Sequence, residues 1–214
     1  MKPASLLRTL LLLLTLSTIY GCQSAVTDEV SNSVELSFDT TSINVPVHEL
    51  PELEEFLASV EPADRQVEWE RVQTSAFSSP TGVIYGDIRY NCGTKLCDHL
   101  WLQIKDDQRR TFDLPASNAS IFVNHAFSPK ETYLALLLGR NEGTELVRHQ
   151  LLILRTDEFR AAAVQGEPVA LSEQAVSSDF AFPILDLEWM DDQTLKIAIP
   201  DTEDKTRTLL LRVS

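Results

Sequence analysis

The stretch that decides the fold reads Ala126-Phe127-Ser128-Pro129, then Tyr133-Leu134-Ala135-Leu136, and then Leu151-Leu152-Ile153-Leu154. It consists of an aromatic strand end, a tight polar turn and two apolar runs of strand length. Apolar and β-branched runs of this length between turn-forming residues are typical of β-strands. The stretch therefore predicts antiparallel strands and a mainly β fold.

The same order of features occurs twice more along the chain. Earlier, Ala76-Phe77-Ser78-Ser79-Pro80 leads into Val83-Ile84-Tyr85-Gly86 and Leu100-Trp101-Leu102-Gln103-Ile104. Later, Trp189-Met190-Asp191-Asp192 leads into Leu195-Lys196-Ile197-Ala198 and Leu209-Leu210-Leu211. Self-similarity of this kind indicates repeated supersecondary units. Residues 67–214 are therefore predicted to form a β domain of three units, with Phe77, Phe127 and Trp189 buried at equivalent places.

The repeated unit resembles the blades of TolB-type and WD-repeat β-propellers, in which an aromatic-Ser-Pro-Asp-Gly turn joins two strands. Phe127-Ser128-Pro129 matches that turn best, although Lys130-Glu131 stands where the family has Asp-Gly. The resemblance implies a partial or small propeller, because closed propellers typically have four to eight blades. Strand-like residues 34–47 are the candidate for a fourth blade. The alternative is an antiparallel meander folded into a sandwich or open barrel.

One short helix is predicted before these units, near residues 52–60. Its apolar stripe consists of Leu53, Phe56, Leu57 and Val60, at the spacing of one helical face. Pro51 suits the first turn and Pro62 ends the helix. The stripe predicts a packing face, with docking onto a partner as the alternative. Val67–Thr74 is then expected to be a strand.

The first 21 residues have the composition of an export signal. Lys2 and Arg8 supply positive charge, and the stretch from Thr9 to Ile19 is apolar. A helix needs about 20 apolar residues to span a bilayer, so this stretch is too short to span but suits a signal peptide. Residues 1–21 are therefore predicted to be a signal peptide.

Ile19-Tyr20-Gly21-Cys22 resembles the lipobox of bacterial lipoproteins, with Tyr20 larger than is usual at its place. The resemblance implies a lipid on Cys22, cleavage after Gly21 and stable attachment to a membrane. The alternative is an ordinary secretory signal with an incidental cysteine. Residues 22–34 are therefore predicted to be the lipidated cysteine and a flexible tether. In lipoproteins of enteric bacteria, Asp after the lipidated cysteine tends to retain the protein at the inner membrane. The resemblance therefore implies, from Gln23, an outer-membrane location facing the periplasm if the host is Gram-negative.

Charge is distributed unevenly along the chain, whose formal net charge is −14. Residues 23–70 hold twelve acids and a single base, Arg65. A nucleic-acid partner is excluded because binding phosphates requires a basic surface. The acidic segment at residues 35–66 would be repelled by anionic lipid heads and would favour a basic protein partner.

Cys92 and Cys97 flank a short hairpin loop between two predicted strands. Facing positions across a hairpin lie within disulfide reach, and an exported compartment permits oxidation. These two cysteines are therefore predicted to form a disulfide. A zinc site with His99 is the alternative, but structural zinc needs four ligands and no second Cys/His pair is present.

The remaining residues predict no catalytic site, no metal and no cofactor. His48, His99, His125 and His149 lack metal-ligand spacing, and no nucleophile elbow or glycine-rich phosphate loop occurs. Ser78 and Ser128 are expected to cap Ser-Pro turns. Asp106-Asp107 and Asp191-Asp192 are expected to be turn acids, and Asn118-Ala119-Ser120 a loop. Weak calcium binding at Asp201–Asp204 is the one alternative.

Together these features predict a membrane-anchored envelope lipoprotein that acts as a non-enzymatic binding or assembly module. Its expected partner, besides the lipid anchor, is another envelope protein. Two alternatives stay open. One is an envelope enzyme whose site is assembled from separate loops, because catalytic constellations need not show in linear spacing. The other is a carrier that holds a small ligand in an apolar cavity.

Overall fold

The computed structural model describes residues 32–214 except 39, 95, 143–144 and 202–204, so the predicted signal peptide, Cys22 and most of the tether lie outside the described residues. The strands are β1 (Ser33–Phe38), β2 (Thr41–Pro46), β3 (Gln73–Ser78), β4 (Ile84–Tyr90), β5 (Asp98–Lys105), β6 (Gln108–Asp113), β7 (Ile121–Phe127), β8 (Tyr133–Glu142), β9 (Glu145–Arg155), β10 (Arg160–Ala161), β11 (Val164–Glu167), β12 (Asp186–Trp189), β13 (Thr194–Pro200) and β14 (Thr206–Val213). The helices are η1 (Val47–Glu49), α2 (Pro51–Ser59), α3 (Arg65–Glu70), η2 (Pro115–Ser117) and α4 (Val169–Val176). Within this part of the chain, no helix has the length and apolar character needed to cross a membrane.

The strands form one hairpin, β1–β2, and three four-stranded antiparallel sheets. Sheet 1 has the order β3-β4-β5-β6 and sheet 2 the order β7-β8-β9-β10. Sheet 3 is a β12-β13-β14 meander whose outer strand, β11, comes from earlier in the chain. The prediction of a mainly β fold built as an antiparallel meander of blade-like units is confirmed. A propeller as such stays a prediction.

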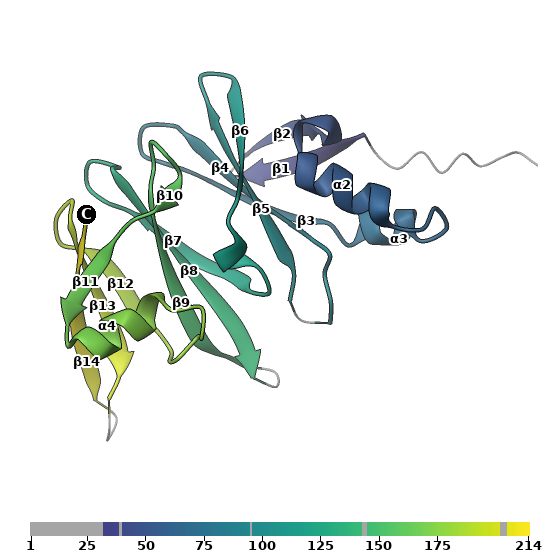
Figure 1. Cartoon of the computed structure of the whole chain (residues 1–214). Coiled ribbons are helices and arrows are strands. Elements are labelled where there is room, and N and C mark those ends of the chain that lie inside the picture. Colours follow the sequence, from purple (N-terminus) through teal and green to yellow (C-terminus); the bar gives the residue numbers. More distant parts are fainter. Residues whose placement is uncertain (1–31, 39, 95, 143–144, 202–204) are drawn as a thin grey trace, which may run out of the picture.

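The sheets lie one after another as layers (Figure 1). The β1–β2 hairpin and α2 pack on one face of sheet 1 around Leu36, Leu53 and Leu100. The other face of sheet 1 packs on sheet 2, and the second face of sheet 2 packs on sheet 3. Sheets 1 and 2 are therefore each covered on both faces.

Sheet 2 is covered on both faces and sheet 3 on one, and the burial of their strands differs accordingly. Residues 133–138 of β8 are all buried, whereas β13 alternates between buried and partly exposed residues. Leu195, Ile197 and Ile199 point into the core shared with sheet 2. Burial of each such aliphatic side chain contributes about 1.5–3 kcal/mol. Thr194 and Lys196 lie on the opposite face, which no element among the described residues covers.

The turns β3–β4, β7–β8 and β12–β13 correspond to one another, but the aromatic residues before them do not all stand at the same position. The N–H groups of Ser79, Ser128 and Met190 donate to the carbonyls of Val83, Tyr133 and Thr194 respectively. Phe127 and Trp189 directly precede this position, whereas Phe77 lies two residues before it. Phe77 therefore points from sheet 1 toward sheet 2, while Phe127 and Trp189 point back to the preceding sheet. The predicted equivalence of Phe77 is wrong, because a shift of one residue turns a side chain to the other face.

A carboxylate from each later turn binds the turn of the preceding sheet. Glu131, in the turn of sheet 2, accepts a 2.5 Å hydrogen bond from Thr81 in the turn of sheet 1. Asp192, in the turn of sheet 3, accepts hydrogen bonds from Ser128 at 2.6 Å and Thr132 at 2.7 Å. The backbone N–H of Lys130 also donates to Asp192, at 3.0 Å. The same polar contact therefore fixes the spacing of neighbouring layers twice.

These contacts stabilise the ionised forms of both carboxylates. Burial would raise the pKa of the Asp192 carboxyl, but the hydrogen bonds from Ser128 and Thr132 outweigh it and hold the pKa below its usual value. Burial likewise opposes a low pKa at Glu131, and hydroxyl hydrogen bonds from Thr81 and Ser79 again lower the pKa. Both contacts are therefore strongest when the carboxylates are charged.

The helices agree with the sequence only in part. The predicted helix near residues 52–60 is present as α2, with Leu53 and Leu57 buried. The predicted strand at Val67–Thr74 is wrong, since α3 occupies its first half and β3 begins only at Gln73. The Arg65 guanidinium donates to the carbonyls of Leu57 and Val60, which joins α3 to the end of α2. Helix α4 had no counterpart in the predicted elements.

Asp192→Asn is expected to lower the free energy of unfolding by about 1–2 kcal/mol at pH 7, since an amide cannot accept all three hydrogen bonds as a charged group does. A carboxyl whose folded pKa lies below its unfolded pKa contributes stability above the unfolded value of about 3.9 and loses it as pH falls through the folded value. The free energies of unfolding of the parent chain and of Asp192→Asn, measured in urea, should therefore approach each other as the pH falls below about 4. Asp179→Asn, at an exposed carboxylate, is the control, and an equal effect there would contradict the prediction.

Candidate functional site

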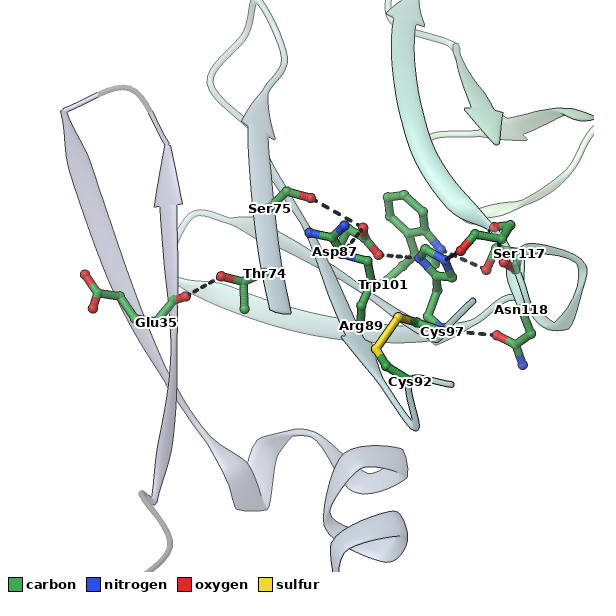
Figure 2. A network of polar contacts seen from close by, with 12 residues as sticks. Glu35, Thr74, Ser75, Asp87, Arg89, Cys92, Cys97, Trp101, Ser117 and Asn118 are labelled. Carbon is green, nitrogen blue, oxygen red and sulfur yellow. Dashed lines mark hydrogen bonds and ion pairs between the residues drawn. A yellow bond between two sulfur atoms is a disulfide. The ribbon is translucent and has the colours of Figure 1, made fainter. Parts of the chain in front are cut away.

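Asp87, His99 and Ser120 form a buried polar cluster beside the connection from sheet 1 to sheet 2. Figure 2 shows Asp87 within the surrounding network of polar contacts. Asp87 comes from β4, His99 from β5, and Ser120 from the residue before β7. Their exposed fractions are 0%, 1% and 1%, so each polar group needs a partner inside the protein.

The three side chains meet in the order acid, imidazole, hydroxyl. The Asp87 Oδ1 atom lies 2.6 Å from His99 Nδ1. The His99 Nε2 atom lies 3.1 Å from the carbonyl oxygen of Ser120 and 3.3 Å from its hydroxyl. A carboxylate, a histidine and a serine in this order are the parts of a nucleophile–base–acid triad.

Further hydrogen bonds of Ser120 and His99 decide whether the cluster is arranged as a catalytic triad. The Ser120 hydroxyl donates to the carbonyl of Ser117 at 2.5 Å, so its proton faces away from His99. Both imidazole nitrogens of His99 are engaged, Nδ1 by Asp87 and Nε2 by the carbonyl of Ser120. The geometry therefore suits a hydrogen-bonded tie between strands better than a general base.

Asp87 has two further partners on sheet 1. Ser75 donates to Asp87 Oδ2 at 3.3 Å, and Arg89 Nε forms an ion pair with the same oxygen at 3.4 Å. Trp101 donates its indole N–H to the Ser117 hydroxyl at 3.1 Å (Figure 2). The cluster thus joins three strands of sheet 1 to η2.

Cys92 and Cys97 are disulfide-bonded beside this cluster, with their Cα atoms 4.1 Å apart, as predicted. The carbonyl of Cys97 accepts the N–H of Ala119, and the Asn118 side chain accepts the N–H of His99. From sheet 2, Arg140 donates to the carbonyl of Ala119. The connection between sheets 1 and 2 is therefore held from both sides.

A small pocket of about 200 Å³ lies against this connection. Arg89, both disulfide cysteines and Ser120 are among its lining residues. The Ser120 hydroxyl is itself buried and already bonded to Ser117. The pocket does not by itself make Ser120 available to a substrate.

The contacts of the histidines show the role of each ring and exclude the alternative of a zinc site at His99. His149 Nδ1 accepts the N–H of Ile184, and burial lowers the pKa of His149. His125 stacks on Phe77, and burial lowers its pKa also. The ring nitrogens of His99 face Asp87 and Ser120, so His99 does not form a zinc site with the disulfide-bonded cysteines. His48 lies in η1.

The structure confirms some of the predicted turn residues and contradicts one. The Ser128 hydroxyl accepts the N–H of Tyr133 and so caps its turn, as predicted. In sheet 1 this role belongs to Ser79, which accepts the N–H of Val83, and the prediction for Ser78 is wrong. Asp106-Asp107 forms the turn between β5 and β6, as predicted. Most of the Asp201–Asp204 loop lies outside the described residues, and no group of three metal-ligating side chains occurs within them.

The open face of sheet 3 carries a groove of about 760 Å³ between the sheet and α4. Its floor includes Leu210 on β14, which is 51% exposed, and its helical wall includes Val169, which is 53% exposed. Glu167 and Glu173 line the groove beside α4, and Arg212 lies on its floor. Sequence reasoning missed this groove because α4 was not predicted.

The comparisons with known proteins give no family. No family model, no curated protein and no solved structure matches the chain.

Asp87→Ala is expected to destabilise the protein by about 3–5 kcal/mol, because it leaves a buried His99 and Arg89 without their carboxylate. The measurement is the free energy of unfolding in urea, compared with Asp98→Ala on the same hairpin. Among the described residues, Asp98 accepts a hydrogen bond from the exposed Asn91 side chain, so its loss should cost about 1 kcal/mol or less. Equal effects of the two substitutions would contradict a buried tie at Asp87.

Removal of the disulfide by Cys92→Ser with Cys97→Ser is expected to cost about 2 kcal/mol, the chain-entropy value for so short a loop, and to leave the fold intact. Circular dichroism and urea unfolding provide the two measurements. Addition of a reductant should lower the stability of the parent chain by the same amount and leave that of the double variant unchanged. Loss of the β spectrum in the variant would contradict the prediction.

Proposed function

We propose that the protein is a lipid-anchored lipoprotein of the bacterial cell envelope whose β layers act as a non-enzymatic binding or assembly module. The anchor is inferred from the signal-like residues 1–21 and from the lipobox pattern that ends at Cys22. In a Gram-negative host, Gln23 favours the outer membrane with the body facing the periplasm.

The observation that carries the binding role is the uncovered face of sheet 3. Six large apolar side chains are exposed among the described residues, and four of them belong to sheet 3 or the segments flanking it, namely Val169, Leu185, Met190 and Leu210. Val169 and Leu210 line one groove, whereas Leu185 and Met190 flank β12. Singly scattered apolar side chains are normal on a protein surface, but exposed apolar side chains that meet in a groove are typical of an interaction site.

The anchor is tested by Cys22→Ala, which should abolish acylation and leave residues 1–21 uncut. Intact-mass measurement of the parent chain should give a mature N-terminus at an acylated Cys22. The matched control is Cys92→Ser with Cys97→Ser, which removes cysteines but keeps Cys22 and should be acylated normally. A parent chain without lipid, or one cut elsewhere, would remove the anchor from the proposal.

An envelope hydrolase is the second candidate, because Asp87, His99 and Ser120 stand in triad order. The test is labelling of the purified protein with a fluorophosphonate, which reacts with activated serines. The binding module predicts no labelling, since the Ser120 hydroxyl is buried and bonded to Ser117. Labelling that disappears in Ser120→Ala would move the assignment to the hydrolase.

A further inference from the structure

The outer face of sheet 3 is where the layered arrangement stops. The faces that sheets 1, 2 and 3 turn toward one another are buried in the two cores between them. The outer face of sheet 1 is covered by the β1–β2 hairpin and α2. The outer face of sheet 3 has no such cover among the described residues, although Leu210 stands at its centre, 51% exposed.

Strand register places charged groups on either side of Leu210. Leu210 pairs with Glu167 on β11 and with Lys196 on β13. Lys196 is already bonded to Glu188 at 2.7 Å, so its charge is compensated within the face. Glu167 and, on α4, Glu173 are exposed and line the same groove. The groove therefore combines a floor that carries Leu210 and, further along β14, the cation Arg212 with an acidic rim beside α4.

The charge of the face decides between two kinds of occupant. A second copy would form a two-fold contact in which the same surface meets itself. That contact would join two chains of formal charge −14. On this face the acids outnumber the bases, with Asp186, Glu188, Glu167 and Glu173 against Lys196 and Arg212. A surface with an apolar centre and lysine or arginine at its rim would instead meet a complementary charge.

We propose that the groove between α4 and the outer face of sheet 3 docks a different envelope protein, through an apolar side chain over Leu210 and Val169 and basic side chains against Glu167 and Glu173. This rests on the binding role proposed above and names the surface and the chemistry of the partner. Attachment to one membrane would raise the local concentration of such a partner, so a groove of this size suffices for a weak, usable contact.

The experiment is photocrosslinking in intact cells that make the full chain with Leu210→benzoylphenylalanine. The expected result is one discrete adduct with another protein, whose attached peptide carries lysine or arginine next to an apolar residue. Val123→benzoylphenylalanine is the matched control, because Val123 is also an exposed aliphatic residue on a strand, in sheet 2. It should give no such adduct.

Charge reversal tests the acidic rim. Glu167→Lys with Glu173→Lys should reduce the adduct at Leu210 by about tenfold or more, as the loss of two favourable charge contacts implies. Glu54→Lys with Glu55→Lys makes the same change in net charge on exposed residues of α2 and should leave the yield unchanged. Equal losses in the two variants would reduce the effect to long-range charge and overturn the docking face.

The remaining outcomes separate this inference from the proposed function. An adduct with a second copy, with lipid only, or none at Leu210 overturns the docking face. If Val67→benzoylphenylalanine on α3 gives an adduct while Leu210 gives none, the binding module stands and only its surface is wrong. An adduct at Leu210 from an unacylated chain keeps the docking face and removes the anchor.

Discussion

Burial of sheet 2 on both faces is the constraint on which the rest of the structure depends. A sheet that is covered on both sides needs strands that are apolar without alternation, and residues 133–138 of β8 are of this kind. Sheets 1 and 3 supply the two covers, and each must present one apolar face to sheet 2. Sheet 1 needs a cover of its own, which the β1–β2 hairpin and α2 provide.

Apolar packing alone would let neighbouring layers slide, because it is not directional. The turn carboxylates supply direction at one edge, where Glu131 reaches back to Thr81 and Asp192 reaches back to Ser128 and Thr132. The Asp87–His99 pair fixes the connection between sheets 1 and 2 in the same way. These polar groups thus specify an arrangement that hydrophobic burial stabilises.

The sequence allowed the class of fold, the repeated units, α2 and the Cys92–Cys97 disulfide to be predicted, because each leaves a local pattern. It did not reveal the layer order, although the alternation of Leu195, Ile197 and Ile199 against the unbroken run in β8 was a readable signal that sheet 3 has one open face. The partners of Asp87 and His99 lie across strands, so linear spacing could not show them. The extra serine before Pro80 hid the offset of Phe77 from the other two aromatic residues. Helix α3 was missed because its apolar residues also fit the pattern of a strand.

Hydrogen–deuterium exchange of the purified chain, resolved to single strands, tests the layered account most directly. Amides that open only when the whole protein unfolds should lie in the doubly covered sheets, with β8 and β9 the slowest to exchange. Amides of β11, at the outer edge of the sheet with one open face, should exchange earlier. Protection of β11 equal to that of β8, or early exchange of β8, would contradict a fold built around sheet 2 with the outer face of sheet 3 left free.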